Sequence, residues 1–425
     1  MGCPKNLTDT ETMIGLLSDC AVIVQDPGQA EVIIVNTCGF IESAKQESID
    51  TILEMAAYKE TGLKKLVVTG CLAQRYSQEI LKELPEVDAL VGATSYPQIV
   101  QIIQQVMQDK QPVLIEDINK QIPENLPRVL ATPTHYAYLK IAEGCDNNCT
   151  YCIIPKIRGR YRSRKIEDIV AEARDLAAKG CKELLLIAQD LTRYGMDNYR
   201  KLMLPDLLRE LNEIEGICRI RLHYCYPEMV TDELIDAMTD CTKVCHYIDI
   251  PMQHISDRIL RRMGRVTSRK NIETLVHKLR DKMPDIVIRS TFITGFPGET
   301  EDDFAMLEAF LTEAKLDKVG VFAFSEEEGT PAARMGDKID PDVAVDRKNQ
   351  LMEIQRGISL AKSREKIGKT LVVLSDGNGS GRSDGDSPEV DGKVFFAGKS
   401  TPGDMVRVKI TRAMEYDLEG TIINE

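Results

Sequence analysis

Apolar residues recur along the chain in two patterns, short β-branched runs and longer stretches with helical spacing. In the first 110 residues, the runs Glu31 to Asn36 and Lys65 to Thr69 predict strands. The stretches Ile41 to Tyr58 and Gln74 to Leu84 predict helices. Strands that alternate with helices are typical of a parallel α/β fold. We therefore expect a small parallel α/β domain over residues 1–110.

Residues 111–130 carry several prolines and little periodicity, which predicts a linker. Beyond them, six strand-like runs alternate with helical patterns. Six β/α units are fewer than the eight of a closed barrel, so we expect an open, partial (β/α)6 TIM-like barrel over residues 131–363, active at the carboxyl ends of its strands. The six runs are His135 to Ile141, Glu183 to Ala188, Arg219 to Tyr224, His246 to Ile250, Ile286 to Ile293 and Lys318 to Phe324.

The pattern changes again over residues 364–425. Three short alternating runs, Thr370 to Leu374, Gly392 to Ala397 and Met405 to Ile410, predict strands of a small antiparallel β-barrel. A tract rich in Gly, Ser and Asp separates the first two. The expected fold class is thus α/β, with a third, all-β domain at the end.

Composition limits the function classes. The chain has 425 residues, of which 43% are hydrophobic and 28% charged, so it can bury a full core. No run approaches the ~18 apolar residues of a membrane-spanning helix, and the first residues lack a signal-peptide pattern. We expect a cytoplasmic protein with no membrane association. Its net charge of −13 disfavours binding to nucleic-acid phosphates.

The chain has twelve cysteines, an unusual number for a protein expected in the reducing cytoplasm. Their strongest cluster is Cys145-Asp-Asn-Asn-Cys149-Thr-Tyr-Cys152, on the loop after the first barrel strand. Three cysteines at this spacing can hold three irons of a [4Fe–4S] cluster and leave one iron open. Zinc is the main alternative, but a structural zinc site needs a fourth ligand, and no Cys or His stands immediately beside the loop.

This spacing resembles the radical S-adenosylmethionine (SAM) enzymes, in which SAM chelates the open iron and is cleaved to a 5′-deoxyadenosyl radical. The stretch Thr291-Phe-Ile-Thr-Gly295-Phe-Pro-Gly298 is similar to a glycine-bearing motif of that superfamily, although an ordinary strand-to-helix turn explains it equally well. The resemblance implies that Gly295 and Gly298 let the backbone approach adenosine. Further candidates for lining the SAM or substrate cavity, each just after a barrel strand, are Gln189, Asp190, Gln253 and His254.

A second triad consists of Cys3, Cys38 and Cys71. Cys38 and Cys71 each follow a predicted strand of the N-terminal domain, so both belong at the same edge of a parallel sheet. Cys3 precedes a predicted helix start near residues 8–12. From the positions of these three cysteines alone, two interpretations are equally open: they bind a second cluster, or they are unrelated thiols.

Seven short motifs are spread over the whole chain: Gly2-Cys-Pro-Lys-Asn6, Val35-Asn-Thr-Cys38, Gly70-Cys71-Leu72, Glu143-Gly-Cys145, Ile154-Pro-Lys-Ile-Arg-Gly159, Asp249-Ile-Pro-Met-Gln-His254 and Glu328-Gly-Thr-Pro331. Together they resemble the methylthiotransferase family of radical SAM enzymes. The resemblance implies an N-terminal cluster domain, a radical SAM core and a C-terminal TRAM domain. It also implies two [4Fe–4S] clusters, SAM, and a sulfur-carrying auxiliary cluster on Cys3, Cys38 and Cys71.

Relatives usually have a strand before the first of these motifs, whereas here Met1 directly precedes Gly2. This departure puts the start of the chain, and with it the ability of Cys3 to hold a cluster, in question.

The Gly-Cys-Pro-Lys-Asn form resembles the branch that modifies the β-carbon of an aspartate in small-subunit ribosomal protein twelve. Relatives that modify adenosine in transfer RNA tend to have Gly-Cys-Gln-Met-Asn. Charge favours the first branch, because residues 366–425 carry eight basic and ten acidic side chains and residues 1–110 carry eight and fifteen. We expect that protein substrate and a reductant protein such as flavodoxin or ferredoxin, and nucleic acid is not the expected substrate.

Two alternatives remain at this point: a transfer-RNA methylthiotransferase, and a non-catalytic iron–sulfur carrier with an RNA-binding barrel. The basic run Lys156 to Lys165 is either an anchor for an acidic partner or a solvated loop. Cys241 and Cys245 suggest a metal pair, but we expect them to be buried small apolar residues, together with Cys20, Cys181, Cys218 and Cys225.

Overall fold

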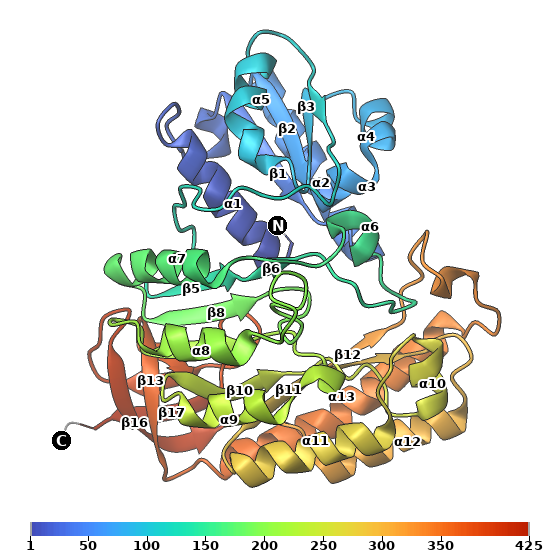
Figure 1. The fold of residues 1–425 in the computed structure, drawn as a ribbon, viewed down its shortest axis with the longest axis vertical. Coiled ribbons are helices and arrows are strands. Elements are labelled where there is room, and N and C mark those ends of the chain that lie inside the picture. Colours follow the sequence, from blue (N-terminus) through green and yellow to red (C-terminus); the bar gives the residue numbers. More distant parts are fainter. Residues whose placement is uncertain (1, 424–425) are drawn as a thin grey trace.

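The computed structural model describes residues 2–423 as three β-sheet units joined in sequence (Figure 1). The first is a four-stranded parallel sheet of order β1-β2-β3-β4 with helices around it. Its elements are α1 (Pro4–Leu17), η1 (Pro27–Gln29), β1 (Val32–Thr37), α2 (Glu42–Ala56), η2 (Ala57–Glu60), β2 (Lys65–Gly70), α3 (Cys71–Arg75), α4 (Ser77–Glu83), β3 (Ala89–Gly92), η3 (Tyr96–Gln98), α5 (Ile99–Val106) and β4 (Val113–Leu114).

The predicted strands and helices of this unit are confirmed to within a few residues, except that the second helix is split into α3 and α4. Two strands were missed. β3 spans only four residues, and β4, two residues long, falls inside the segment expected to be a linker and pairs with β3. Both are too short to give a clear period in the sequence.

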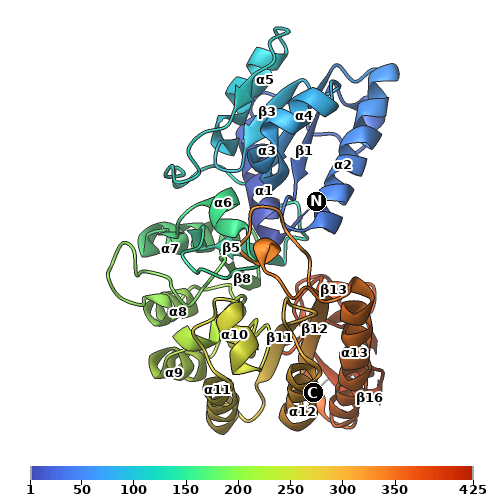
Figure 2. The same ribbon diagram turned by 90° about the vertical axis from the view of Figure 1, so that its right-hand side faces the viewer.

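The second unit is a six-stranded parallel sheet of order β12-β11-β10-β9-β8-β5, which confirms the open, partial barrel. Helices cover its outer face, seen on edge in Figure 2. Its strands are β5 (Tyr136–Lys140), β8 (Glu183–Ile187), β9 (Arg219–Leu222), β10 (Val244–Asp249), β11 (Val287–Thr294) and β12 (Lys318–Ala323), with β6 (Ala142–Glu143) and β7 (Arg162–Ser163) as a separate hairpin. The helices are α6 (Ile154–Arg158), α7 (Ile166–Ala178), α8 (Leu204–Asn212), η4 (Pro227–Met229), α9 (Asp232–Asp240), α10 (Asp257–Arg262), α11 (Arg269–Lys282), α12 (Glu301–Ala314), η5 (Ala332–Arg334) and α13 (Pro341–Arg364).

Side chains alternate between the two faces of this sheet, because successive residues of a strand point in opposite directions. Leu184 and Leu186 join the large apolar core under the outer helices. Their neighbours Glu183 and Leu185, and Tyr136 and Tyr138 of β5, face the inside of the barrel.

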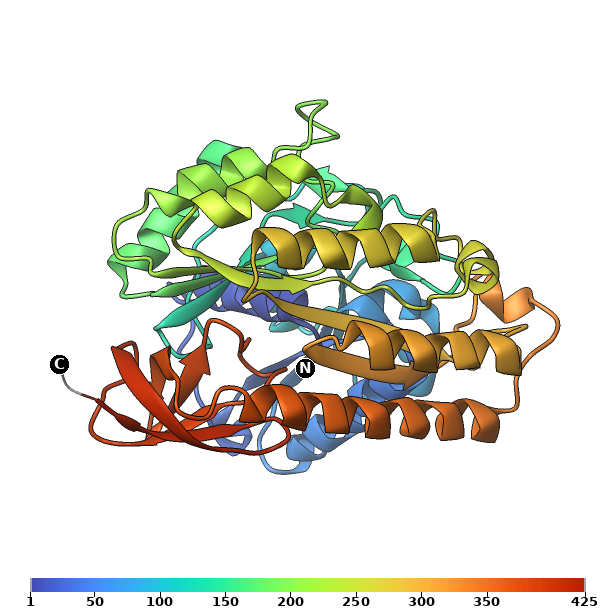
Figure 3. The same ribbon diagram turned by 90° about the horizontal axis from the view of Figure 1, so that it is seen from below.

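The third unit is a closed five-stranded barrel that α13 leads into, as Figure 3 shows from below. The expected small β-barrel is confirmed, but it is not wholly antiparallel, because β15 and β17 run parallel. β14 and β17 were not predicted. β14 lies in the polar tract between the first two expected strands. The strands are β13 (Thr370–Gly377), β14 (Ser380–Ser383), β15 (Val394–Ala397), β16 (Met405–Ala413) and β17 (Leu418–Ile422).

Residues 384–391, here called the closing segment, connect β14 to β15 and reach the inner face of the six-stranded sheet. The Glu389 carboxylate accepts from the hydroxyls of Tyr136 and Tyr138 at 3.1 and 3.2 Å. The Arg221 guanidinium donates to the Asp384 carbonyl at 2.6 Å. The C-terminal unit therefore lines the barrel interior with polar groups. None of the helices between residues 2 and 423 has both the length and the apolar character of a membrane span.

Candidate functional site

Cys38 and Cys71 lie side by side because β1 and β2 run parallel and in register. Thr37 pairs with Gly70, and each cysteine is the next residue of its chain segment. Gly70 has a φ of +95°, and a Cβ there would lie 2.3 Å from the side-chain oxygen of Asn36. Only glycine fits this position, and it turns the chain so that Cys71 begins α3 at the edge of the sheet. The predicted shared edge is confirmed.

Cys3 joins these two thiols at the start of α1. The Sγ atoms of Cys3 and Cys71 lie 3.7 and 3.8 Å from the same oxygen, Oδ1 of Asn6. The amide of Asn6 donates to the carbonyl of Thr37 at 2.8 Å, which fixes it beside Cys38. The structure thus brings together three cysteines that are more than thirty residues apart in the sequence.

The other triad, Cys145, Cys149 and Cys152, occupies the loop between β6 and α6. The Cys145 amide donates to the Gly159 carbonyl at 3.0 Å, and the Thr150 amide donates to the Met263 carbonyl at 2.9 Å. Cys149 Sγ lies 3.5 Å from the hydroxyl of Tyr226. The loop is therefore held at both ends and in the middle, with its thiols on the face formed by the strand ends.

The chemistry of these thiols suits an iron–sulfur cluster. All twelve cysteines are free of disulfides. Burial raises the pKa of Cys71 and Cys152 to about 12 and that of Cys145 to about 11, so these thiols stay neutral unless a bound cation stabilises the thiolate. Among residues 2–423, no group of three or more Cys, His, Asp or Glu side chains is arranged so that it could hold a single metal ion. A cluster has no such requirement, because each cysteine binds a different iron.

Arg158 links Cys71 of one triad to the helix that follows the other triad. It ends α6, which follows the Cys145 to Cys152 loop, and it is almost completely buried. Its Nε donates to Cys71 Sγ at 3.3 Å, and an Nη donates to Asn6 Oδ1 at 2.6 Å. Residues Ile153 and Ile157 pack against Cys71, so α6 and α3 are in direct contact, as Figure 1 shows.

Two buried carboxylates balance the charge of Arg158. Its guanidinium lies 2.8 Å from Asp9 and 3.2 Å from Glu143, and both carboxylates also contact Lys140. Burial alone would raise the pKa of Glu143, but the positive charges of Arg158 and Lys140 hold that pKa well below its usual range. The two units are therefore joined by an ionised network next to both triads.

The four polar candidates for SAM contacts have different surroundings. Gln189 donates to Glu143 at 2.9 Å, and its buried Oε1 has no hydrogen-bond donor, so it can accept one from a bound molecule. Asp190 is fully buried and accepts from Asn147 of the cysteine loop at 2.9 Å. Burial raises the pKa of Asp190. Gln253, with φ of +71°, pairs through its backbone with β11 and is partly exposed.

His254, by contrast, is completely buried. Its Nδ1 accepts from the Ser256 amide at 3.0 Å, and its Nε2 lies 3.4 Å from Glu299, which in turn accepts from the Gly295 amide at 3.1 Å. Gly295 and Gly298 both have positive φ, but a Cβ on Gly295 would meet Ala344 of α13 and one on Gly298 would meet Arg262. Contacts within the chain therefore account for both glycines, and their contact with adenosine stays a prediction.

The burial of two charged side chains, Arg158 and Lys5, was not recognised from the sequence. The basic run Lys156 to Lys165 is not simply a solvated loop, and its role as an anchor for an acidic partner stays a prediction for its exposed members Lys156, Arg160 and Lys165. Arg158 is buried in the network above, and Arg164 is paired with Glu124 and Glu172. Lys5 was noted only as part of a motif. The signal that could have drawn attention to it is a charged residue within three positions of a predicted metal-binding cysteine.

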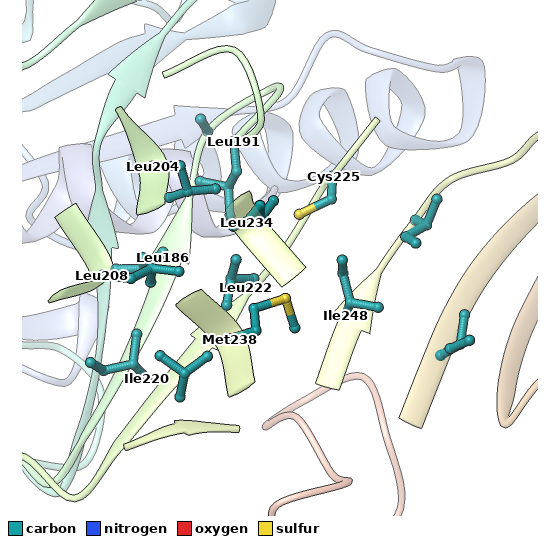
Figure 4. Packing of buried hydrophobic residues seen from close by; sticks show 14 of the residues in the cluster. Leu186, Leu191, Leu204, Leu208, Ile220, Leu222, Cys225, Leu234, Met238 and Ile248 are labelled. Atoms are coloured by element: carbon teal, nitrogen blue, oxygen red, sulfur yellow. The ribbon is translucent and has the colours of Figure 1, made fainter. Parts of the chain in front are cut away.

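The remaining cysteines divide into two groups. Cys181, Cys225, Cys241 and Cys245 are buried as predicted, and Figure 4 shows Cys225 packed among Leu222, Leu234 and Met238. The same prediction is wrong for Cys20 and Cys218, which are exposed. Cys20 lies in the turn after α1, and Cys218 lies in the loop just before β9.

Comparison with known proteins matches three family models along the chain. Residues 1–92 match an uncharacterized protein family (UPF0004), residues 139–311 match the radical SAM superfamily, and residues 367–423 match the TRAM domain. Among solved structures, the radical SAM methyltransferase TsrM from Kitasatospora setae has a TM-score of 0.58 at 14% identity. The match covers 77% of this chain and 71% of that one, and supports the fold alone.

Curated relatives are much more similar in sequence. "Ribosomal protein uS12 methylthiotransferase RimO" of Lachnoclostridium phytofermentans is 50% identical, with 99% of this chain and 98% of that protein covered. The protein of the same name in Clostridioides difficile is also 50% identical, with coverage of 100% and 98%. The similarity thus extends over all three units.

Proposed function

Because the chain belongs to the RimO family of ribosomal protein uS12 methylthiotransferases, we propose that it adds a methylthio group to the β-carbon of an aspartate in ribosomal protein uS12. The observation that carries the proposal is the pair of cysteine triads on adjoining segments, with Arg158 of the helix that follows one triad bound to Cys71 of the other. One triad alone would suit many radical SAM reactions. A second triad beside it suits a reaction in which sulfur is also delivered.

We assign Cys145, Cys149 and Cys152 to the cluster that binds SAM, and Cys3, Cys38 and Cys71 to the auxiliary cluster. When bound, the clusters and SAM supply an electron, a hydrogen-abstracting radical and the sulfur to be transferred. We assign Gln189, with its unpaired Oε1, and the partly exposed Gln253 to direct contact with SAM. We assign Asp190 to holding the cysteine loop, and His254 to holding the Gly295 to Gly298 turn through Glu299.

The same proposal assigns a task to each part of the chain. Residues 1–110 hold the auxiliary cluster, residues 131–363 bind SAM and residues 364–425 form the TRAM barrel, with 111–130 as the linker. A reductant protein such as flavodoxin or ferredoxin delivers electrons in the cytoplasm. A basic ribosomal protein fits the acidic first and last parts better than RNA does, because RNA phosphates would be repelled.

The substrate is tested by incubating the purified, reduced protein and SAM with uS12 and, separately, with an anticodon-stem RNA. We expect mass spectrometry to find the methylthio group on an aspartate of uS12 and none on the RNA. Modification of the RNA with uS12 left unchanged would contradict the proposal and favour a transfer-RNA enzyme.

The division of labour between the triads is tested by two triple variants. Replacing Cys145, Cys149 and Cys152 with Ala abolishes 5′-deoxyadenosine formation. Replacing Cys3, Cys38 and Cys71 with Ala leaves that product but abolishes methylthio transfer to uS12. If both variants still transfer a methylthio group to uS12, the assignment of the two triads to the two clusters is wrong.

A further inference from the structure

Lys5 is a buried positive charge with no carboxylate partner among residues 2–423. Only 7% of this residue is exposed, and among residues 2–423 it is the only Lys or Arg more than nine-tenths buried that has no carboxylate partner. A buried charge without a partner is costly. The other seven such residues, each with a paired carboxylate, are Lys45, Arg158, Arg219, Arg221, Arg265, Arg347 and Arg382.

The contacts of the Lys5 ammonium leave it free to bind an anion. Nζ lies 3.4 Å from the carbonyl oxygen of Ala188 and 4.1 Å from the centre of the Tyr224 ring. An ammonium has three N–H donors, so this single long hydrogen bond leaves at least two without an acceptor. Tyr224 itself adopts a φ of +62°, which is rare for a residue of its size and typical of functional sites.

Lys5 also lies between the proposed sulfur source and the barrel mouth. It is two residues from Cys3 in the first turn of α1, whose amides favour negative charge. Ala188 and Tyr224 follow β8 and β9, at the carboxyl ends where ligands of such sheets bind. The neighbouring cation Arg289 is already paired with Asp249 and Asp391. Among the described Lys and Arg side chains that are more than nine-tenths buried, Lys5 is therefore the one left for a ligand.

We propose that Lys5 binds the side-chain carboxylate of the substrate aspartate. This inference rests on the proposed function, which supplies a substrate of matching charge. The carboxylate carbon of aspartate is bonded directly to the β-carbon that receives the methylthio group. An ammonium that holds the carboxylate thus positions that β-carbon next to the Cys3, Cys38 and Cys71 triad. Lys5 makes and breaks no covalent bond in this role.

The test compares binding of uS12 with binding of a uS12 variant in which the modified aspartate is Asn. Both are titrated into the cluster-loaded protein without SAM. We expect the wild type to bind the Asp form about 10- to 100-fold more tightly, the loss expected from one charge-assisted contact. Lys5→Met, which keeps the length but not the charge, should abolish this preference, and Lys5→Arg should retain most of it. Lys82→Met, at an exposed lysine of the same unit, is the matched control.

The outcomes separate the two proposals. If the wild type thiomethylates uS12 and Lys5→Met still prefers the Asp form, the role of Lys5 is wrong while the proposed function stands. If the wild type leaves uS12 unmodified, the proposed function itself is wrong, and the role of Lys5 that rests on it is wrong as well. A fall in Lys5→Met from about eight irons per chain to about four would also contradict the proposal, because Lys5 would then support the auxiliary cluster instead of the substrate.

Discussion

At the scale of single residues, His223 is a buried group whose protonation opposes folding. It follows β9 and lies 2.9 Å from the Ser387 hydroxyl of the closing segment. Burial and the charges of Arg221 and Arg289 lower its pKa from 6.5 to about 3. The ring is therefore neutral in the folded protein at any pH near neutrality.

This shift predicts a loss of stability in mild acid. Between pH 6.5 and about 3, the unfolded chain binds a proton at His223 that the folded chain does not. The free energy of unfolding therefore falls as the pH drops below 6.5, by about 1.4 kcal/mol at pH 5.5 from this residue alone. His223→Gln removes the effect, so its stability relative to wild type should improve between pH 7.5 and 5.5. Parallel stability profiles of the two proteins in urea unfolding would show that His223 is not the cause.

Burial of single charges was the part of the site that the sequence could not reveal. The cysteines were recognisable because their chemistry is restricted and their place after strands follows from topology. Lys5 and Arg158 belong to residue types that are usually exposed. Their burial depends on Ala188, Asp9, Asn6 and Cys71, which are brought to them only by the packing of two units.

At the scale of elements, the contact between β11 and α13 depends on Gly295. A Cβ at this position would lie 2.2 Å from the Cβ of Ala344, and the backbone has a φ of +72°. The Thr294 hydroxyl also donates to the Ala344 carbonyl at 2.8 Å. The end of β11 is thus seated directly on the first turn of the long helix.

We predict that Gly295→Ala lowers the free energy of unfolding by about 2 kcal/mol or more, because the added methyl group has no space. Gly357→Ala is a control in the same helix, where a Cβ meets no atom within 4 Å. That substitution should raise stability by about 1 kcal/mol, because alanine favours a helix interior. Urea unfolding measures both, and equal stabilities of the two variants would contradict the proposed contact.

The elements that the sequence predicted well are those with a strong apolar pattern. All six strands of the barrel were located within about two residues because their buried faces require continuous apolar runs. β14, with the sequence Ser-Gly-Arg-Ser, has no such run. It is a strand because β13 and β15 pair with it on either side. The Asn378-Gly379 turn that joins it to β13 was the local hairpin signal, and it was hidden in the polar tract.

At the scale of the whole molecule, the N-terminal unit and the barrel are joined by buried charges. Arg158, Lys140, Asp9 and Glu143 come from both sides of this boundary and compensate one another. Removing one member leaves the others uncompensated, which is more costly than replacing the whole network.

We therefore predict that Arg158→Met destabilises the protein by about 3–5 kcal/mol and weakens the attachment of the auxiliary cluster, because Cys71 loses its donor. Arg160→Met, two residues away and exposed, should change stability by no more than about 0.5 kcal/mol. Urea unfolding and iron content per chain measure the two effects. An Arg158→Met protein with unchanged iron content and stability would show that the network does not join the units.

The closing segment also affects the order in which the molecule can be completed during synthesis. Arg219 of β9 pairs with the carboxylate of Asp384 in the closing segment, which is made much later. Arg221 is paired with Glu183 within the barrel but gains the Asp384 carbonyl only at that stage, when His223 also gains the Ser387 hydroxyl. Until the last part of the chain has been translated, the barrel contains polar groups without partners. Completion of the interior is thus coupled to the end of translation, and a nascent chain stalled before the TRAM barrel would be a substrate for chaperones instead of an enzyme.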